Sequence, residues 1–123
     1  MLENLVTEKI IGCVLNVHKA LGPGLLESAY KECLYYELDK SGVPVEKEKP
    51  MPLIYQEVRM DCGYRVDLLV EHCVIVEIKA VEALNDVHMA QVMTYMKLAE
   101  CRIGLLMNFN VRLLKDGIKR IIL

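Results

Sequence analysis

The sequence lacks any apolar run close to the ~20 residues that a helix needs to cross a bilayer. Its first residues, MLENLVTEKIIGC, have an acidic residue at position three and no basic cluster, unlike a secretory signal. These absences predict a cytoplasmic protein without a membrane anchor. Hydrophobic residues nevertheless make up 54% of the 123 residues. Such an excess suggests a partner surface, most simply on a homodimer.

The sequence also lacks a C-x-x-C pair. Its five cysteines are odd in number and scattered, which favours neither a zinc knuckle nor a disulfide framework. A cluster of Cys62, His72 and Cys73 would lack a fourth metal ligand. We therefore expect most of these thiols to be small core residues.

The net charge of the chain is −2, so its overall charge does not indicate a nucleic-acid binder. From Cys101 onward, however, five basic residues stand against one acidic residue. A basic C-terminal surface could bind phosphates. Alternatively, these charges solvate exposed strands, and the sequence leaves both interpretations open.

No repeat or linker divides the sequence, which predicts one domain over residues 1–123. Apolar spacing predicts helices, a change to alternation predicts strands, and the Gly22-Pro23-Gly24 turn separates the first two helices. The expected helices cover 3–22, 25–42 and 85–100, and the expected strands lie within 43–60, 63–71, 73–81, 102–109 and 115–123. The order of two helices, three or four strands, a helix and two strands predicts an α/β fold with a mixed central sheet flanked by helices.

Charged residues interrupt two of the most apolar predicted strands. Alternation places Glu77 and Lys79 on one face, and a hairpin would bring Asp67 near Glu77 on that face. Two neighbouring carboxylates repel each other, and a hard divalent cation such as Mg²⁺ relieves that repulsion. Lys79 could then orient a water or stabilise a charged transition state. The ordinary alternative is an amphipathic strand with a weak, solvated ion pair.

Asp67 and Glu77-Ile78-Lys79 together resemble the D-x(n)-(D/E)-x-K signature of the PD-(D/E)XK nuclease superfamily. Gln91 and Tyr95 are similar to the Q-x-x-x-Y element of its RecB-like and Cas4-like branches. The residue before Asp67 is Val66, where the superfamily's name has proline.

Upstream, GLLESAY supplies Gly24, Glu27 and Tyr30, which resemble the G-x-x-E-x-x-Y element that names one family of this superfamily. The resemblance covers nearly the whole chain. Each motif is short, and their common order makes the resemblance specific.

The resemblance implies a restriction-endonuclease-like core and a Mg²⁺- or Mn²⁺-dependent nuclease that hydrolyses DNA or RNA, with DNA preferred. It implies that Asp67, Glu77 and the carbonyl of Ile78 are metal ligands. Glu27 would complete the acidic site from a helix.

The resemblance further implies that Lys79 positions the attacking water, and that Gln91 and Tyr95 contact substrate phosphate or brace the site. His18 would either bind the metal or interact with the end of its helix. A non-catalytic module that binds nucleic acid or protein on the same fold is the alternative function.

Overall fold

The computed structural model describes residues 2–123, in which two helices precede the first strand and a third helix joins two parallel strands. The helices are α1 (Leu2–Leu21), α2 (Glu27–Lys40), α3 (Asp86–Ala99) and the short 3₁₀ helix η1 (Leu114–Asp116). The strands are β1 (Val45–Pro50), β2 (Leu53–Tyr55), β3 (Val58–Met60), β4 (Arg65–Val70), β5 (Val74–Lys79), β6 (Ile103–Asn108) and β7 (Ile118–Ile122). The expected α/β fold with a mixed sheet flanked by helices is confirmed.

The main sheet has five strands in the order β1-β4-β5-β6-β7. Only β5 and β6 run parallel, and α3 is the crossover that connects them. The other neighbours are antiparallel, with β4 and β5 forming the predicted hairpin around Glu71 and His72. Both central strands, β5 and β6, are buried along almost their whole length.

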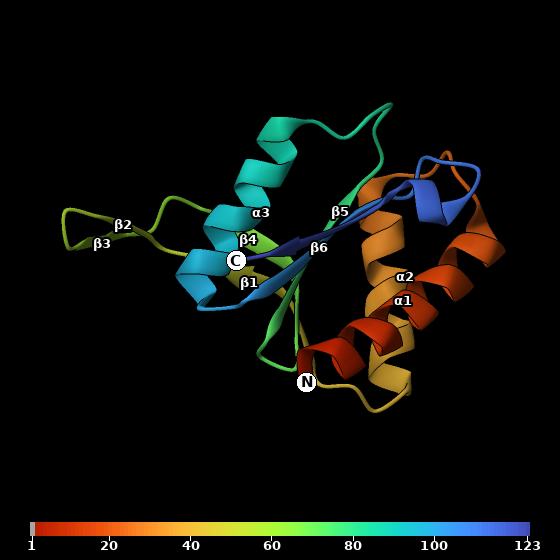
Figure 1. The fold of residues 1–123 in the computed structure, drawn as a ribbon, viewed down its shortest axis with the longest axis horizontal. Coiled ribbons are helices and arrows are strands. Elements are labelled where there is room, and N and C mark those ends of the chain that lie inside the picture. Colours follow the sequence, from red (N-terminus) through yellow and green to blue (C-terminus); the bar gives the residue numbers. More distant parts are fainter. Residues whose placement is uncertain (1) are drawn as a thin grey trace.

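Helices cover both faces of this sheet, so each face has its own apolar core. In Figure 1, α1 and α2 lie on one side of the strands and α3 lies on the other. Val74, Val76 and Ile78 of β5 contribute to the core under α1 and α2, whereas Ile75 contributes to the core under α3. Glu77 and Lys79 alternate with the first set and therefore face α3.

Gly104 allows α3 to lie close to β6. A Cβ at this position would come within 2.7 Å of both Met96 Sδ and Val92 Cγ1 on α3. Because real side-chain atoms do not approach so closely, a larger residue would push α3 outward. The helix that carries Gln91 and Tyr95 is thus held tightly against the sheet.

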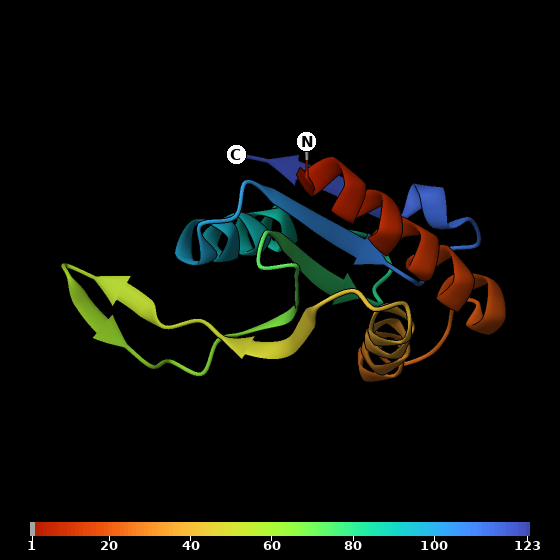
Figure 2. The same cartoon turned by 90° about the horizontal axis from the view of Figure 1, so that it is seen from below.

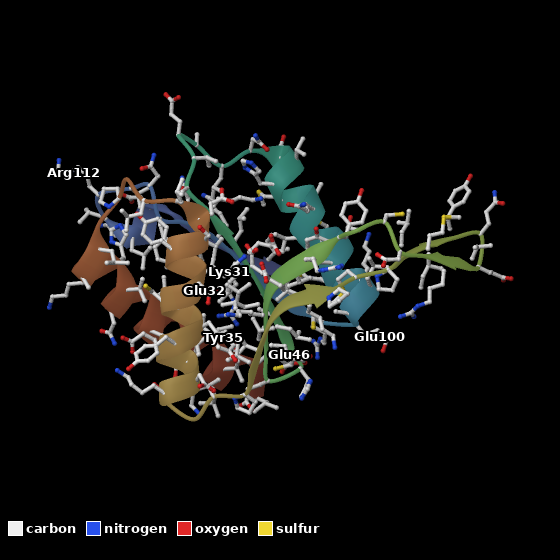
Figure 3. The ribbon with its side chains drawn as sticks, turned by 180° about the vertical axis from the view of Figure 1, so that it is seen from behind. Lys31, Glu32, Tyr35, Glu46, Glu100 and Arg112 are labelled. Carbon is white, nitrogen blue, oxygen red and sulfur yellow. The ribbon has the colours of Figure 1, made fainter. Side chains whose placement is uncertain are left out.

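Ion pairs hold the edge strand β1 to α2. Lys47 Nζ lies 2.6 Å from Glu32 Oε1 and 4.9 Å from the centroid of the Tyr35 ring. Figure 3 shows Glu32 and Tyr35 on α2. The alternating charges of β1 also mark it as a sheet edge that discourages pairing with another chain.

The strand pattern differs from prediction between residues 43 and 60. This stretch divides into β1 and a separate two-stranded hairpin, β2–β3, so five strands rather than three or four precede α3. The ladder between β1 and β4 ends at Pro50, and Pro52 precedes the hairpin. Gln56 and Glu57, both with positive φ, form its tight turn. The hairpin projects from the body as an arm (Figure 2), which we call the β2–β3 arm.

Some expected core positions are exposed. The apolar spacing of residues 25–42 would place Leu26 on the buried face of the second helix, but Leu26 is the N-cap residue before α2 and is 77% exposed. Leu5 of α1 is likewise exposed, whereas Tyr30 and Leu34 are fully buried. Cys13 and Cys101 are buried, and Cys33 and Cys73 are half-buried against the core under α1 and α2, so four of the five cysteines contact a core and Cys62 is exposed. In residues 2–123, no helix has both the length and the apolar character to span a bilayer.

Candidate active site

Asp67 and Glu77 meet where the hairpin ladder between β4 and β5 ends. Regular pairing runs from Val70 opposite Val74 to Leu68 opposite Val76. Beyond it, side chains join the strands. The amide of Asp67 donates to Glu77 Oε1 at 2.9 Å, and the amide of Ile78 donates to Asp67 Oδ2 at 2.8 Å. The predicted proximity of the two carboxylates is therefore present.

Burial and mutual repulsion make these two carboxylates hard to ionise together. Glu77 is only 4% exposed. Burial first, and the charge of Asp67 second, raise the pKa of Glu77 from 4.5 to about 8. Burial also raises the pKa of Asp67, against the opposing effect of the Ile78 amide. A nearby cation would stabilise the doubly ionised pair.

Lys79 connects this pair to α3. Its Nζ lies 3.4 Å from Gln91 Oε1, and Gln91 Nε2 donates to the Tyr95 hydroxyl at 3.2 Å. Burial, followed by the charge of Glu77, raises the pKa of Tyr95. Lys79, Gln91 and Tyr95 therefore form one polar chain beside the carboxylates.

Glu27 approaches from the other face of the sheet, at the first turn of α2. Its Oε2 accepts a hydrogen bond from the amide of Ala80 at 3.1 Å, directly after Lys79. The Glu27 charge also disfavours ionisation of Asp67. The hydrogen bond to Ala80 places the Glu27 carboxylate at the end of β5 that carries Lys79. Unlike Glu77, the Glu27 side chain is exposed.

Tyr30 fixes the entrance to α2 and thereby the position of Glu27. Its hydroxyl donates to the carbonyl of Gly22 at 2.6 Å and accepts from the amide of Leu25 at 3.1 Å. Its ring stacks on Phe109 at 4.4 Å. Gly24, between these bonds, has a φ of 103°, which disfavours other residues. In this motif, Gly24 forms the turn, Glu27 supplies the carboxylate, and Tyr30 anchors the start of α2.

Lys31 is a charged neighbour of the site that sequence reasoning missed. It lies one turn after Glu27, and its positive charge favours ionisation of Asp67. Its side chain is 15% exposed and forms an ion pair with Glu48 at 2.9 Å. Figure 3 shows Lys31 on the side of α2 that faces the strands. The spacing of four residues from Glu27 was the only available signal.

Asn108 is a second residue that sequence reasoning missed. It is 2% exposed and lies beside Lys79 at the end of β6. Its Oδ1 accepts from the amides of Val81 and Asn110 at 3.1 Å, and its Nδ2 donates to the Val81 carbonyl at 2.9 Å. Asn108 therefore positions the segment that leaves Lys79.

His18 has a different partner. It is buried, and its Nε2 donates to the carbonyl of Val111 at 2.7 Å. Metal binding through Nε2 would break this bond. Throughout the described residues 2–123, no three His, Cys, Asp or Glu side chains form a group able to hold a metal. The compact oxygen set is instead the two carboxylates, Asp67 and Glu77, together with the adjoining backbone.

The family model of the PD-(D/E)XK nuclease superfamily matches residues 4–121. The chain belongs to this superfamily. No curated protein and no solved structure matches the sequence. In this PD-(D/E)XK chain the acidic pair and the lysine lie on a hairpin at the centre of the sheet, facing the helix that carries Gln91 and Tyr95.

The basic C-terminal residues do not converge on this PD-(D/E)XK site. Arg102 precedes β6 and Arg112 follows it, so they flank opposite ends of that strand. Both are exposed, as are Lys119 and Arg120 on the edge strand β7. This distribution favours the interpretation that these charges solvate exposed segments.

Proposed function

We propose that this chain is a nuclease that hydrolyses phosphodiester bonds of nucleic acid, with DNA as the expected substrate and Mg²⁺ or Mn²⁺ as cofactor. The observation that carries the proposal is the pair of buried Glu77 and half-buried Asp67, with Lys79 beside it. Keeping two carboxylates in apolar surroundings costs stability unless a cation or proton neutralises them. Superfamily membership over residues 4–121 supports the same conclusion.

The proposed metal ligands are Asp67, Glu77 and the carbonyl of Ile78, with Glu27 as a further carboxylate at the rim. Oxygen atoms of this kind suit hard divalent cations, and the high pKa of Glu77 supports the need for one. When bound, such a cation supplies Lewis-acid polarisation of the phosphate and lowers the pKa of water. His18 stays outside this proposed set because its Nε2 already has a carbonyl partner.

Lys79 is proposed as the donor that orients the attacking water and stabilises the charge that develops on the phosphate. It cannot be a metal ligand while protonated, because an ammonium has no lone pair. Gln91 and Tyr95 are proposed to bind the neighbouring phosphate. Their hydrogen-bonded chain to Lys79 supports a shared substrate.

Within the superfamily, we place the chain with the G-x-x-E-x-x-Y family and the RecB-like and Cas4-like branches, as a single nuclease domain over residues 1–123. The anchoring of Glu27 by the turn at Gly24 and by Tyr30 supports the first assignment. The hydrogen bond between Gln91 and Tyr95 supports the second.

We also propose a homodimer. The β2–β3 arm exposes Ile54, Tyr55, Val58 and Met60, and an isolated two-stranded hairpin is marginal without a partner. Light scattering at micromolar concentration should give twice the chain mass. The mass of a single chain would contradict this proposal.

Cleavage assays test the activity. The wild type should cleave single- or double-stranded DNA or RNA with Mg²⁺ or Mn²⁺, and EDTA should stop cleavage. Lys79→Ala should lower the rate by at least ~10²–10³ while retaining metal binding. Lys97→Ala, an exposed lysine in the last turn of α3, is the matched control. If the wild type cleaves none of these substrates but binds them, the non-catalytic alternative holds.

A further inference from the structure

A cavity of about 300 Å³ lies between the base of the β2–β3 arm and α3. Leu53 and Tyr64 form its wall on the arm side. Ala90, Gln91, Thr94 and Tyr95 contribute from α3. The volume falls at the lower end of the range for small-molecule sites, ~300–1,000 Å³.

The cavity is continuous with the candidate active site through two shared residues. Gln91 and Tyr95 line the cavity and also form the polar chain to Lys79. A molecule seated in the cavity would therefore lie next to a group held by Lys79. Because it shares these two residues with the candidate active site, the cavity is not an unrelated groove elsewhere on the surface.

The chemistry of the lining fits a nucleobase rather than a phosphate. No charged side chain is among the residues that line it, and the surface is mainly apolar. Tyr64 remains 46% exposed, and its ring meets that of Tyr95 edge-on at 6.4 Å and 65°. An aromatic ring of this kind offers a face on which any base can stack. The hydroxyl of Thr94 donates to the Ala90 carbonyl, and its oxygen can accept from a base edge. Gln91, whose amide atoms contact Lys79 and Tyr95, stays with the phosphate.

We propose that this cavity binds one unpaired nucleobase of the substrate, beside the phosphate held near Lys79. The inference rests on the proposed nuclease function and deepens it. Charged groups around Lys79 bind the backbone, and the uncharged cavity binds the base attached to it. Because a paired base is stacked inside the duplex, it must be extruded before it can enter the cavity. The enzyme therefore favours nucleic acid with an unpaired nucleotide at the scissile position.

Binding of labelled oligonucleotides tests the inference without cleavage. The wild-type protein, kept free of metal with EDTA so that no cleavage occurs, is titrated with a 12-nucleotide single strand, the same strand made abasic, and a blunt duplex, with fluorescence anisotropy as the readout. We expect removal of the bases, or pairing in the duplex, to weaken binding ~5- to 100-fold, the equivalent of the stacking contribution of one base.

Two variants in the same background address the cavity itself. Ala90→Phe, at an exposed position of α3, fills the cavity, and Tyr64→Ala removes its stacking face. Both should weaken single-strand binding ~5- to 100-fold and leave duplex binding within twofold. Tyr64→Phe keeps the ring and should bind like the parent. Tyr36→Ala, an exposed tyrosine of α2 outside the cavity lining, is the control.

Undiminished single-strand binding by Ala90→Phe, equal binding of the abasic strand, or no binding of any strand would overturn the inference. A change in molecular mass with Ala90→Phe would also overturn it, because the cavity would then belong to a contact between copies. If the wild type cleaves nucleic acid and the cavity variants cleave it equally well, the inference fails and the nuclease proposal stands. Base-dependent binding without cleavage removes the nuclease proposal and leaves the cavity site intact.

Discussion

The amide of Asp67 donates a hydrogen bond to the carboxylate of Glu77 at 2.9 Å, across the end of the central hairpin. One oxygen of Glu77 is thus fixed by the backbone of the neighbouring strand. The Asp67 carboxylate is fixed in turn by the Ile78 amide. Both acids are oriented by main-chain groups, so their positions depend on the hairpin register rather than on flexible side-chain contacts.

The stability of the metal-free protein should fall as pH rises. Glu77 has a pKa of about 8 in the folded chain and an ordinary value of 4.5 when unfolded. Below pH 4.5 Glu77 is protonated in both the folded and the unfolded chain, and its contribution to the free energy of unfolding is fully present. As pH rises to 8, the unfolded chain releases the proton first, so the free energy of unfolding decreases by about 2–4 kcal/mol.

Urea unfolding between pH 5 and pH 9 measures this effect. Glu77→Gln should remove most of the pH dependence, because the amide cannot ionise. Glu82→Gln, an exposed carboxylate in the loop after β5, should leave the dependence unchanged. Stability that rises with pH over this range in the wild type would contradict the predicted sign.

Lys31→Met should raise the affinity for Mn²⁺ several-fold. The Lys31 charge favours ionised Asp67 but repels a divalent cation at the same carboxylates, and methionine keeps most of the side-chain volume. Nucleic-acid binding should weaken, because one positive charge close to Asp67 is lost. Calorimetric Mn²⁺ titration provides the measurement.

Lys40→Met is the matched control for Lys31→Met, since Lys40 lies on the same helix and is exposed. Its contacts are an ion pair with Glu37 at 3.6 Å and the Tyr36 ring at 5.3 Å, both on α2. It should leave both affinities unchanged. Equal effects of the two substitutions would show that Lys31 acts through general charge rather than through its position at the site.

Asn108→Ala should destabilise the fold by about 1–3 kcal/mol, because it leaves the Val81 amide and carbonyl without their buried partner. For a chain of this size the corresponding loss of melting temperature is roughly 5–10 °C. Cleavage should also slow, because the segment after Lys79 loses its support. Asn110→Ala removes an exposed amide at 3.5 Å from the same carbonyl and should shift the melting temperature little.

Much of the fold follows from sequence periodicity. The helices at 3–22, 25–42 and 85–100 were predicted within a few residues of α1, α2 and α3. The proximity of Asp67 to Glu77 was also predictable, since a hairpin turning at Glu71 and His72 brings these positions opposite each other. Local signals suffice where a segment's period and turn residues decide its structure.

Features that depend on contacts between distant segments could not be predicted. Asn108 reads as one more polar residue after an apolar strand, and only the parallel pairing of β5 with β6 brings it beside Lys79. Lys31 resembles any lysine of an amphipathic helix until α2 lies against the sheet. The cavity at Tyr64 requires the arm and α3 to meet, although they are far apart in the sequence.

Calorimetric titration with Mn²⁺ at pH 7 tests the central claim, that Asp67 and Glu77 form a metal-binding pair, most directly. We expect the wild type to bind with measurable heat, Glu77→Gln and Asp67→Asn to bind at least tenfold more weakly, and Lys79→Ala to bind like the wild type. No binding by the wild type, or equal binding by Glu77→Gln, would contradict the account.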